Sequence, residues 1–339
     1  MHQPLALRCD AAALAGNFHH LQNLAGVPAG AAIKADAYGL GAREAARHLL
    51  DAGCRDFFVS TWWEAAELDF LPPDSLAVLH GLGVNDAALP GVRPVLVSPE
   101  QIVRWKNAGP PDAPCDVMID TGMNRLGLRA EDIDLLEGLS IHTLHSHLAC
   151  ADEDIPVNDR QLEAFRALRS AVPAQRYSLA NSAGILLGRD YAFDLVRPGL
   201  ALYGGIPRAE GRGLVRQVAT PEAQIIQLRT VPAGETVGYN ATFAAATDTR
   251  IAIINIGYAD GYWRGFSSRG MARFQGRELA VVGRVSMDLV ALKVDGAADI
   301  REGDWVELAF DLEHAAQTSG MSQYELLTGL GSRFRRYWI

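Results

Sequence analysis

A lysine ends one of the short apolar segments of this chain, and a tyrosine follows it four residues later. The segment reads AAIKADAYG (31–39), with Lys34 after the apolar run and Tyr38 before the glycine. A lysine removed from water has a lowered pKa and becomes nucleophilic, which suits formation of a Schiff base with an aldehyde. A lysine at a strand end also commonly packs its stem and keeps its amine in water. The pattern alone favours this second interpretation.

Other short stretches contain residues that could bind an anion or a metal. In HSH, His145 and His147 would lie on one face of a strand, as core residues or as metal ligands, but no third ligand follows at a recognisable spacing. Asn181 in ANSAG fits a plain strand-to-helix cap. Arg197 in VRPG could be a surface arginine beside a proline turn. The role of each of these residues can be inferred only together with the motifs around it.

The elements that must position these residues alternate between short apolar runs and helical patterns. Continuously apolar strands separated by helices predict a parallel sheet that is covered on its outer face. The predicted helices are 42–53, 98–109 and 157–172. The predicted strands are 31–35, 57–61, 76–82, 93–98, 115–120, 141–149, 176–181 and 194–204. Eight such units predict a (β/α)₈ barrel of the TIM type, whose active site lies at the carboxyl ends of the strands, although a doubly wound open sheet has the same periodicity.

The pattern changes after a glycine-rich stretch, YGGIPRAEGRG (203–213), which reads as a linker or lid. Strand-like segments with few helical breaks follow it, and turn residues such as PAGE and REGD separate them. This predicts an antiparallel β domain of about 120 residues. We therefore expect a barrel domain at 1–213 and a β domain at 214–339. The first residues of the chain could pair with the second domain.

Charge and cysteine content narrow the classes of function. The 339 residues include 31 basic and 40 acidic side chains, and a net charge of −9 argues against general nucleic-acid binding, which needs a basic face. The four cysteines are widely spaced and predict reduced thiols in a cytoplasmic protein. No signal peptide is recognisable, and the apolar runs are shorter than the roughly 18 residues that a membrane span requires. We expect no nucleic-acid partner and no membrane partner.

Eight stretches, in order and in register, resemble the alanine racemases, which are fold-type-III enzymes that use pyridoxal 5′-phosphate (PLP). They cover nearly the whole chain and both predicted domains. The stretches are IKADAYG (33–39), DTGMNRLGLR (120–129), SHLACADE (146–153), LANSAG (179–184), VRPGLALYGG (196–205), VGYNATF (237–243), IGYADGY (256–262) and VGRVSMD (282–288).

The resemblance implies a role for each motif residue that contacts the cofactor. Lys34 resembles the lysine that holds PLP as an internal aldimine, and His147 the histidine near the pyridoxal ring. Tyr38 resembles the tyrosine that binds the cofactor phosphate. The other residues that match phosphate-binding positions are Asn181, Ser182, Gly199, Leu200 and Tyr258.

Arg197 resembles the arginine that faces the pyridine nitrogen, where many other PLP enzymes place a carboxylate. A guanidinium does not give up its proton at working pH, so the ring nitrogen should stay unprotonated. An unprotonated ring is a weaker electron sink. The resemblance therefore implies reprotonation at the substrate Cα, and racemisation rather than transamination.

Racemisation also needs an acid/base on the opposite face of the substrate. Tyr239 resembles that group, contributed by the partner subunit of a homodimer, and Met287 resembles a substrate-contacting methionine that also acts in trans. Arg125 resembles the arginine that positions the substrate carboxylate. The resemblance implies that Lys34 takes the proton from the D-enantiomer of alanine and Tyr239 from the L-enantiomer.

Two positions depart from the family pattern. Met118 stands where many relatives have a carbamylated lysine that orients the arginine, so Arg125 must be held by another group, such as an anion or Asn124. A phosphate-binding tyrosine of some relatives aligns with Ser332, and Tyr337 is a candidate substitute. Three alternatives to an alanine racemase stay open: a broad-specificity racemase for serine or basic amino acids, a decarboxylase, and a non-catalytic PLP carrier.

Overall fold

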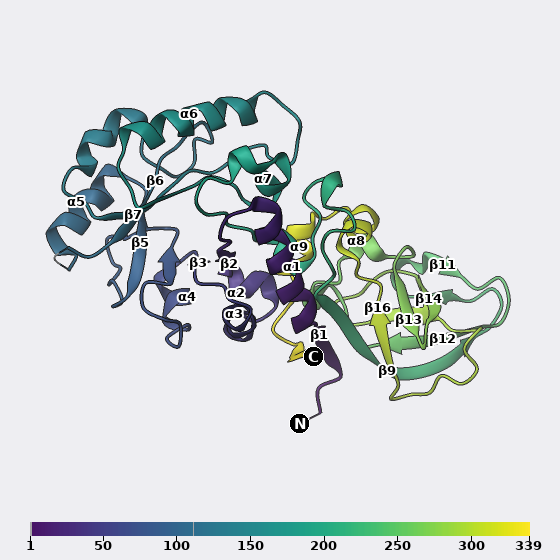
Figure 1. Ribbon diagram of the computed structural model, residues 1–339. Coiled ribbons are helices and arrows are strands. Elements are labelled where there is room, and N and C mark those ends of the chain that lie inside the picture. The colour runs from purple at the N-terminus through teal and green to yellow at the C-terminus, as the bar shows by residue number, and fades with distance from the viewer. Residues whose placement is uncertain (1, 111) are drawn as a thin grey trace. The chain divides into compact units, whose positions relative to one another are not determined.

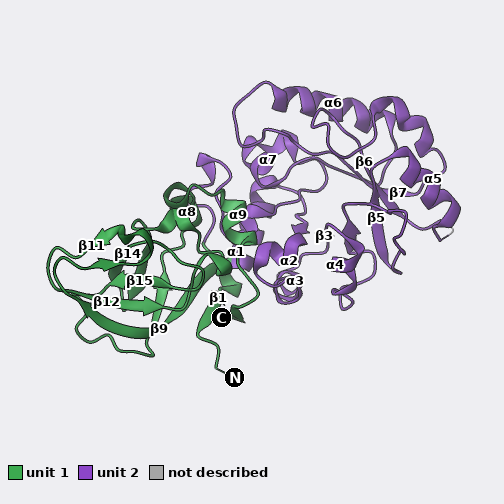
Figure 2. Ribbon diagram, turned by 180° about the vertical axis from the view of Figure 1, so that it is seen from behind, with its two compact units in different colours: residues 1–13, 217–339 green, residues 14–216 purple. Residues whose placement is uncertain are grey.

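The computed structural model describes residues 2–110 and 112–339, and its contacts divide the chain into two compact units. One unit is Leu14–Arg216, and the other combines the segment up to Ala13 with Gln217–Ile339 (Figure 2). The N-terminal strand therefore belongs to the same unit as the C-terminal third of the chain.

A parallel sheet forms the centre of the first unit, and each of its strands pairs with the next along the chain (Figure 1). Most residues of its strands are buried, as the apolar runs predict. The strands are β2 (Ala31–Ala32), β3 (Phe57–Val59), β4 (Leu76–Val78), β5 (Val92–Leu96), β6 (Cys115–Met118), β7 (Ile141–His145) and β8 (Arg176–Ser178).

The first part of the eighth predicted strand (194–204) closes the ring, whereas Leu200–Tyr203 form a 3₁₀ turn instead of continuing the strand. On one side of segment 194–198, the backbone N–H of Arg197 donates to the carbonyl of Ala180, at 2.9 Å, just after β8. On the other side, the N–H of Gly30 donates to the carbonyl of Val196, at 2.8 Å, just before β2. A doubly wound open sheet would leave its two outer strands unpaired. The predicted barrel of the TIM type is confirmed.

Helices follow the strands of this unit, and the three predicted ones are confirmed. Ser98 and Pro99 begin α5 in the usual way, because the serine Oγ accepts the N–H of Gln101 at 3.3 Å and proline suits the first helical position. In α6 the buried Leu162, Phe165 and Leu168 fall on one face. The helices are α1 (Ala11–Ala25), α2 (Lys34–Gly39), α3 (Ala42–Asp51), α4 (Trp62–Ala66), α5 (Pro99–Ala108), α6 (Val157–Ala171) and α7 (Ser182–Leu187).

The second unit is built on a mainly antiparallel sheet of eight strands, as the sequence predicts. The exception to antiparallel pairing is the N-terminal strand, which pairs antiparallel with β9 and parallel with β17. A short hairpin, β10 (Thr236–Val237) and β11 (Phe243–Ala244), stands outside this sheet. The sheet strands are β1 (Leu5–Cys9), β9 (Ala219–Val231), β12 (Thr249–Ile254), β13 (Met271–Phe274), β14 (Arg277–Val282), β15 (Val290–Lys293), β16 (Trp305–Leu308) and β17 (Arg335–Trp338).

Two short helices complete the second unit, α8 (Leu312–Ser319) and α9 (Gln323–Thr328). Asp311 and Ser322 cap them, each accepting a backbone N–H of the first turn. Across the described parts of both units, no helix is long and apolar enough to cross a membrane.

Candidate active site

Lys34 begins a turn of unusual handedness directly after β2. The predicted strand 31–35 is too long, because β2 ends at Ala32 and the backbone then enters the left-handed region. Such a conformation costs an L-residue about 1–2 kcal/mol, so it persists only where the surroundings enforce it. The residues in this conformation, with φ from 51° to 56°, are Ala35, Asp36, Ala37 and Tyr38.

Two carboxylates hold this left-handed turn. Glu64, in the first turn of α4, accepts the backbone N–H of Ala35 at 2.8 Å. The Asp36 carboxylate accepts the N–H of Ala42 at 2.7 Å, at the start of α3. The turn is therefore fixed to two helix N-termini, and Lys34 leaves the barrel strand in a defined direction.

The environment of Lys34 lowers the pKa of its amine. Burial lowers its pKa most, and the positive charges of Arg125 and Arg197 lower the pKa further, whereas Glu64 acts in the opposite direction. A neutral amine is the form that can attack an aldehyde carbon. A lowered pKa is what the nucleophilic interpretation of Lys34 requires, and this role stays a prediction.

Arg197 is a buried cation, and no carboxylate within residues 2–110 and 112–339 forms an ion pair with it. Its side chain is 7% exposed, and one Nη donates to the carbonyl of Ser146 at 2.6 Å while the other donates to the hydroxyl of Ser178. Burial lowers the pKa of Arg197 to about 10, against the opposing effect of Asp116. Arg197 is therefore still protonated at neutral pH, and two neutral oxygens fix its plane.

The backbone at Gly199 approaches the Tyr38 side chain so closely that no other residue fits there. A Cβ at position 199 would lie 2.2 Å from the Tyr38 hydroxyl oxygen. The Tyr38 ring also packs against Tyr203, with ring centroids 5.0 Å apart. Leu200 follows in a buried 3₁₀ turn. The predicted residues Tyr38, Gly199 and Leu200 are therefore adjacent.

The start of α7 joins the same cluster. The Ser182 hydroxyl accepts two backbone N–H groups, from Gly199 at 2.9 Å and from Ala201 at 3.2 Å. Asn181 caps α7 by accepting the N–H of Gly184 at 2.9 Å, so the strand-to-helix cap is confirmed for its side chain. Ser182 and Gly199 thus lie together with Tyr38.

The two histidines of HSH have different surroundings. His147 has a pKa lowered to about 3, first by burial and then by Arg197 and Arg125, so its ring is neutral. His145 is fully buried, and its Nε2 donates to Asp116 at 3.1 Å, since a carboxylate can only accept. Within residues 2–110 and 112–339, no group of three or more side chains could hold a metal ion.

Met118 belongs to the apolar core of the barrel. It packs in a cluster with Phe58, Val95 and other buried residues. The side chain of Arg125 is exposed, and no hydrogen bond joins it to Asn124 or to another described residue. Arg125 therefore keeps its donors available to a ligand.

The remaining predicted residues lie in the second unit, on turns that touch one another. The backbone N–H of Tyr258 donates to the carbonyl of Ser286 at 3.1 Å, and that of Ala259 to Met287 at 3.1 Å. A Cβ at Gly257 would lie 2.2 Å from the Met287 carbonyl oxygen, so only glycine allows this approach. Tyr258 and Met287 are therefore held on neighbouring turns.

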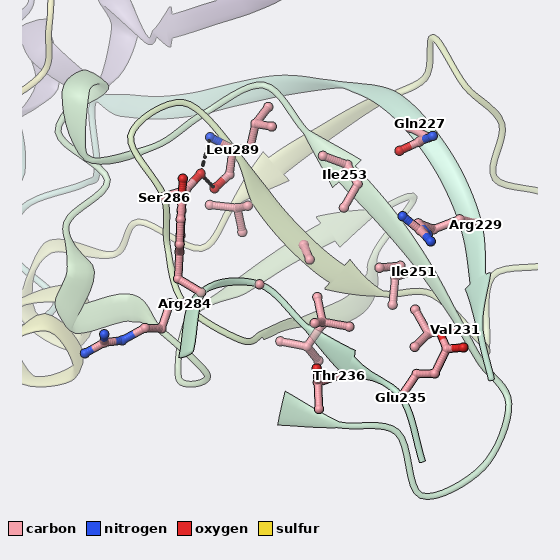
Figure 3. A pocket seen from close by; sticks show the side chains of 16 residues that line it. Gln227, Arg229, Val231, Glu235, Thr236, Ile251, Ile253, Arg284, Ser286 and Leu289 are labelled. Carbon is pink, nitrogen blue, oxygen red and sulfur yellow. Dashed lines mark hydrogen bonds between the residues drawn. The ribbon is translucent and has the colours of Figure 1, made fainter. Parts of the chain in front are cut away.

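Tyr239 occupies the tip of the β10–β11 hairpin and borders a hollow in the second unit. The hollow has a volume of about 580 Å³ and an apolar wall that includes Ile251 and Ile253 (Figure 3). Polar side chains such as Arg229 and Arg284 stand at its margin. Tyr239 is 69% exposed, although aromatic side chains are usually at least half-buried in a folded chain.

The sequence predictions missed several side chains that hold this site. Glu64, Ser146 and Ser178 contact it through neighbouring barrel strands or helices, and their residue types are common in loops and caps. Tyr337, the candidate phosphate-binding residue near the C-terminus, lies in the sheet of the second unit, where its hydroxyl donates to Glu222 at 2.8 Å.

The residues of the barrel fit a cofactor with an aldehyde, a ring nitrogen and a phosphate. Lys34 offers an amine of lowered pKa, Arg197 a fixed cation, and Tyr38 a phenol beside the backbone at Gly199. A barrel with such a strand end, joined to an antiparallel β domain, defines the class of PLP-dependent enzymes of fold type III.

The chain belongs to the alanine racemase family. The model of the alanine racemase N-terminal domain matches residues 9–207, and that of the C-terminal domain matches residues 218–338. The chain is 42% identical to an alanine racemase of Acidiphilium cryptum over 99% of both chains. It is also 41% and 40% identical to the catabolic and the biosynthetic alanine racemase of Agrobacterium fabrum, over 98% and 99% of this chain and 92% and 94% of theirs.

Solved structures agree with this assignment. The alanine racemase of Bartonella henselae, described with covalently bound pyridoxal phosphate, matches with a TM-score of 0.89 and 35% identity over 100% of both chains. The biosynthetic alanine racemase of Pseudomonas aeruginosa matches with a TM-score of 0.88 and 34% identity, also over 100% of both chains.

Proposed function

We propose that this chain is a PLP-dependent racemase that interconverts L- and D-alanine. The observation that carries the proposal is that one barrel contains both Lys34, whose pKa is lowered, and the buried cation Arg197, whose charge contributes to that lowering. PLP, when bound, supplies an aldehyde for the amino acid and a ring that accepts electron density from Cα. The residues of the chain then decide where the Cα proton goes.

Lys34 and Tyr239 are the two acid/base groups in this proposal. The neutral amine of Lys34 takes the Cα proton from D-alanine on one face, and the phenol oxygen of Tyr239 takes it from L-alanine on the other. A single base would tend to return the proton to the face from which it came. The lowered pKa of Lys34 supports this role, because an amine accepts a proton only in its neutral form.

Arg197 directs the proton back to Cα. Its guanidinium is fixed by Ser146 and Ser178 and remains protonated at neutral pH, so it can only donate to a ring nitrogen. A ring nitrogen that receives this hydrogen bond stays unprotonated and withdraws fewer electrons. This supports racemisation over transamination and separates the proposal from a decarboxylase, which normally has a carboxylate at this place.

The remaining site residues bind and orient. Tyr38, Ser182 and the backbone at Gly199 would hold the cofactor phosphate, with Asn181, Leu200 and Tyr258 as further phosphate-binding residues and His147 beside the pyridoxal ring. Arg125 has no hydrogen-bond partner among the described residues, and its guanidinium would hold the substrate carboxylate. Met287, which is 53% exposed, would contact the substrate together with Tyr239.

We further propose a homodimer in which each barrel receives Tyr239 and Met287 from the partner subunit. The exposure of both side chains and the apolar hollow beside Tyr239 support a surface that another chain covers. Mixing the variants Lys34→Ala and Tyr239→Phe tests this arrangement. Random reassortment should restore about a quarter of wild-type activity, because half the dimers would carry one intact site. A site completed within one chain predicts no recovery.

Chiral analysis of alanine after incubation with the purified, PLP-loaded protein tests the activity itself. Starting from L-alanine, we expect an approach to equal amounts of both enantiomers and no turnover by Lys34→Ala. A panel of L-amino acids separates alanine from the broader substrates, since a few pocket residues decide between a methyl group and a larger side chain. Absence of turnover with every amino acid would indicate a PLP carrier.

We place the protein in the cytoplasm. All four cysteines are free thiols, and three of them are buried. Burial raises the pKa of Cys9, Cys54 and Cys115 to about 12, so these thiols stay protonated and unreactive. Free thiols are typical of a reducing compartment.

A further inference from the structure

A buried glutamine of α6 joins two segments that carry site residues. Gln161 is 1% exposed, and its amide oxygen accepts the backbone N–H of Ala149 at 2.8 Å. Its Nε2 donates to the carbonyl of His147 at 3.0 Å and to the hydroxyl of Thr121 at 3.1 Å. A buried amide without partners is strongly unfavourable, so these three bonds fix both segments to the helix.

Thr121 extends this network to Arg197. The Thr121 hydroxyl also forms a hydrogen bond with the Ser146 hydroxyl, at 2.8 Å, and the backbone carbonyl of Ser146 is the oxygen that accepts from Arg197. Connected polar networks of this kind act as a unit when every member is satisfied.

Thr121 also begins the loop that carries Arg125. The preceding residue, Asp120, accepts the backbone N–H groups of Gly122 and Met123, both at 2.8 Å, which closes the first turn of the loop. The backbone of Asp120 pairs with Leu128 at the far end of the loop. The loop 120–128 is therefore a closed unit, and Thr121 is its side-chain link to β7 and to α6.

We propose that Gln161 is a positioning residue for the racemase reaction. It sets the register between the loop 120–128 and the end of β7, so that Arg125, His147 and Arg197 keep their mutual spacing. Gln161 acts through these residues and does not contact the substrate itself. The inference rests on the proposed function, which assigns the substrate carboxylate to Arg125 and the cofactor ring to the other two.

The chain supplies a matched control in Gln101 of α5. Its amide oxygen accepts the N–H of Val97 at 3.1 Å, and its Nε2 donates to the carbonyl of His80 at 2.9 Å. Gln101 thus links a helix to the ends of two barrel strands in the same manner, but the segments it holds carry no predicted site residue.

The test compares Gln161→Met, Thr121→Val and Gln101→Met in the PLP-loaded, full-length protein. Because a small displacement of a binding group can cost about 10²-fold in rate, we expect kcat/KM for alanine to fall by roughly 10- to 100-fold in Gln161→Met, with most of the change in KM. Amide hydrogen exchange in 120–128 should become faster, and the visible circular dichroism of bound PLP should change. Gln101→Met should also lower Tm, since it removes two hydrogen bonds, while kcat/KM stays within about two-fold of wild type.

Thr121→Val removes one link of the same network and tests the proposal if Gln161→Met does not fold. The double variant Gln161→Met/Thr121→Val should have a kcat/KM no lower than that of the more impaired single variant, because the effects of two substitutions in one network do not add. Equal exchange in 120–128 and equal kinetics for Gln161→Met and Gln101→Met would overturn the proposal. If the wild-type protein does not turn over alanine, the proposed function fails, while hydrogen exchange and the dichroism of bound PLP still decide the role of Gln161.

Discussion

At the scale of single residues, the site depends on approaches so close that they fix the residue type. Gly199 lies against the Tyr38 hydroxyl, and Gly257 lies against the backbone of Met287. Gly199 brings the main chain against the Tyr38 side chain, and Gly257 brings it against another stretch of main chain. These glycines belong to the motifs LVRPG and IGYADG. The absence of a Cβ therefore explains why each motif has glycine at this position.

Gly199→Ala should therefore weaken cofactor binding. The added Cβ would meet the phenol oxygen of Tyr38 at 2.2 Å and displace it, and overpacking of this kind typically costs about 1–3 kcal/mol. We expect PLP to be lost from the variant during dialysis, as measured by visible absorbance. Gly296→Ala is the control, because no atom lies within 4 Å of its added Cβ and PLP should be retained. Equal retention by both variants would show that the approach at Gly199 does not matter.

Sequence reasoning identified the motif residues but not the side chains that support them. Lys34 and Arg197 lie in recognisable motifs, and the barrel brings them close enough for their charges to interact. Glu64, Ser146 and Ser178 are separated from them by many residues in sequence, so only the register of neighbouring strands and helices reveals their contacts. The left-handed turn after Lys34 was also invisible, because none of its first three residues is glycine or asparagine, the usual residues in this conformation.

At the scale of elements, β5, β6 and β7 carry charges into the interior of the barrel. The carboxylate of Asp116 accepts Arg93 Nε at 3.0 Å and His145 Nε2 at 3.1 Å, and all three side chains are buried. The apolar runs predict these three strands, and the structure has a strand in each run, although β7 ends at His145 and not at 149. The ionic cluster was not predicted, since its members are distributed over three strands whose pairing the sequence does not state.

This cluster makes the stability of the protein depend on pH. Burial is the main cause that lowers the pKa of His145, from 6.5 to about 4. Between these values the unfolded chain binds a proton that the folded protein does not, so stability is lost as the pH falls below 6.5. The lowered pKa of Asp116 acts only below about 3.8, outside this range.

His145→Gln should reduce that dependence. Glutamine can still donate to Asp116 but does not titrate, so the loss of unfolding free energy between pH 7 and pH 5 should be smaller by about 2 kcal/mol. Urea unfolding at the two pH values measures the difference. His147 contributes equally in both proteins, because its pKa is also lowered, to about 3. An unchanged difference between the two pH values would contradict the assignment of a neutral, buried His145.

At the scale of the whole molecule, the chain is not divided into two contiguous halves. Strand β1, at the N-terminus, lies between β9 and β17 of the second unit and is almost completely buried. Arg8 on this strand pairs with Glu222 of β9 at 2.8 Å. The second unit therefore needs both ends of the chain, and by its contacts the chain divides after Ala13 and after Arg216.

Deleting residues 2–9 should open the second unit and leave the barrel sheet intact. Without β1, the neighbouring edges of β9 and β17 lose their backbone partners, and their amides should exchange at least about 100-fold faster. The strands β2–β8 should keep their protection. Arg8→Gln is the control, because it removes the ion pair but keeps the strand, and a partly exposed pair is worth about 1 kcal/mol or less. Protected amides in β9 and β17 of the deletion variant would show that β1 is dispensable.

The central claim is that two groups, on opposite faces of the substrate, move the Cα proton. The most direct measurement is exchange of that proton with deuterated solvent in the Tyr239→Phe variant, followed separately for each enantiomer of alanine. We expect that D-alanine still exchanges through Lys34, that L-alanine exchange falls by at least about 10³-fold, and that net racemisation falls with it. Racemisation of both enantiomers at the wild-type rate would contradict the central claim.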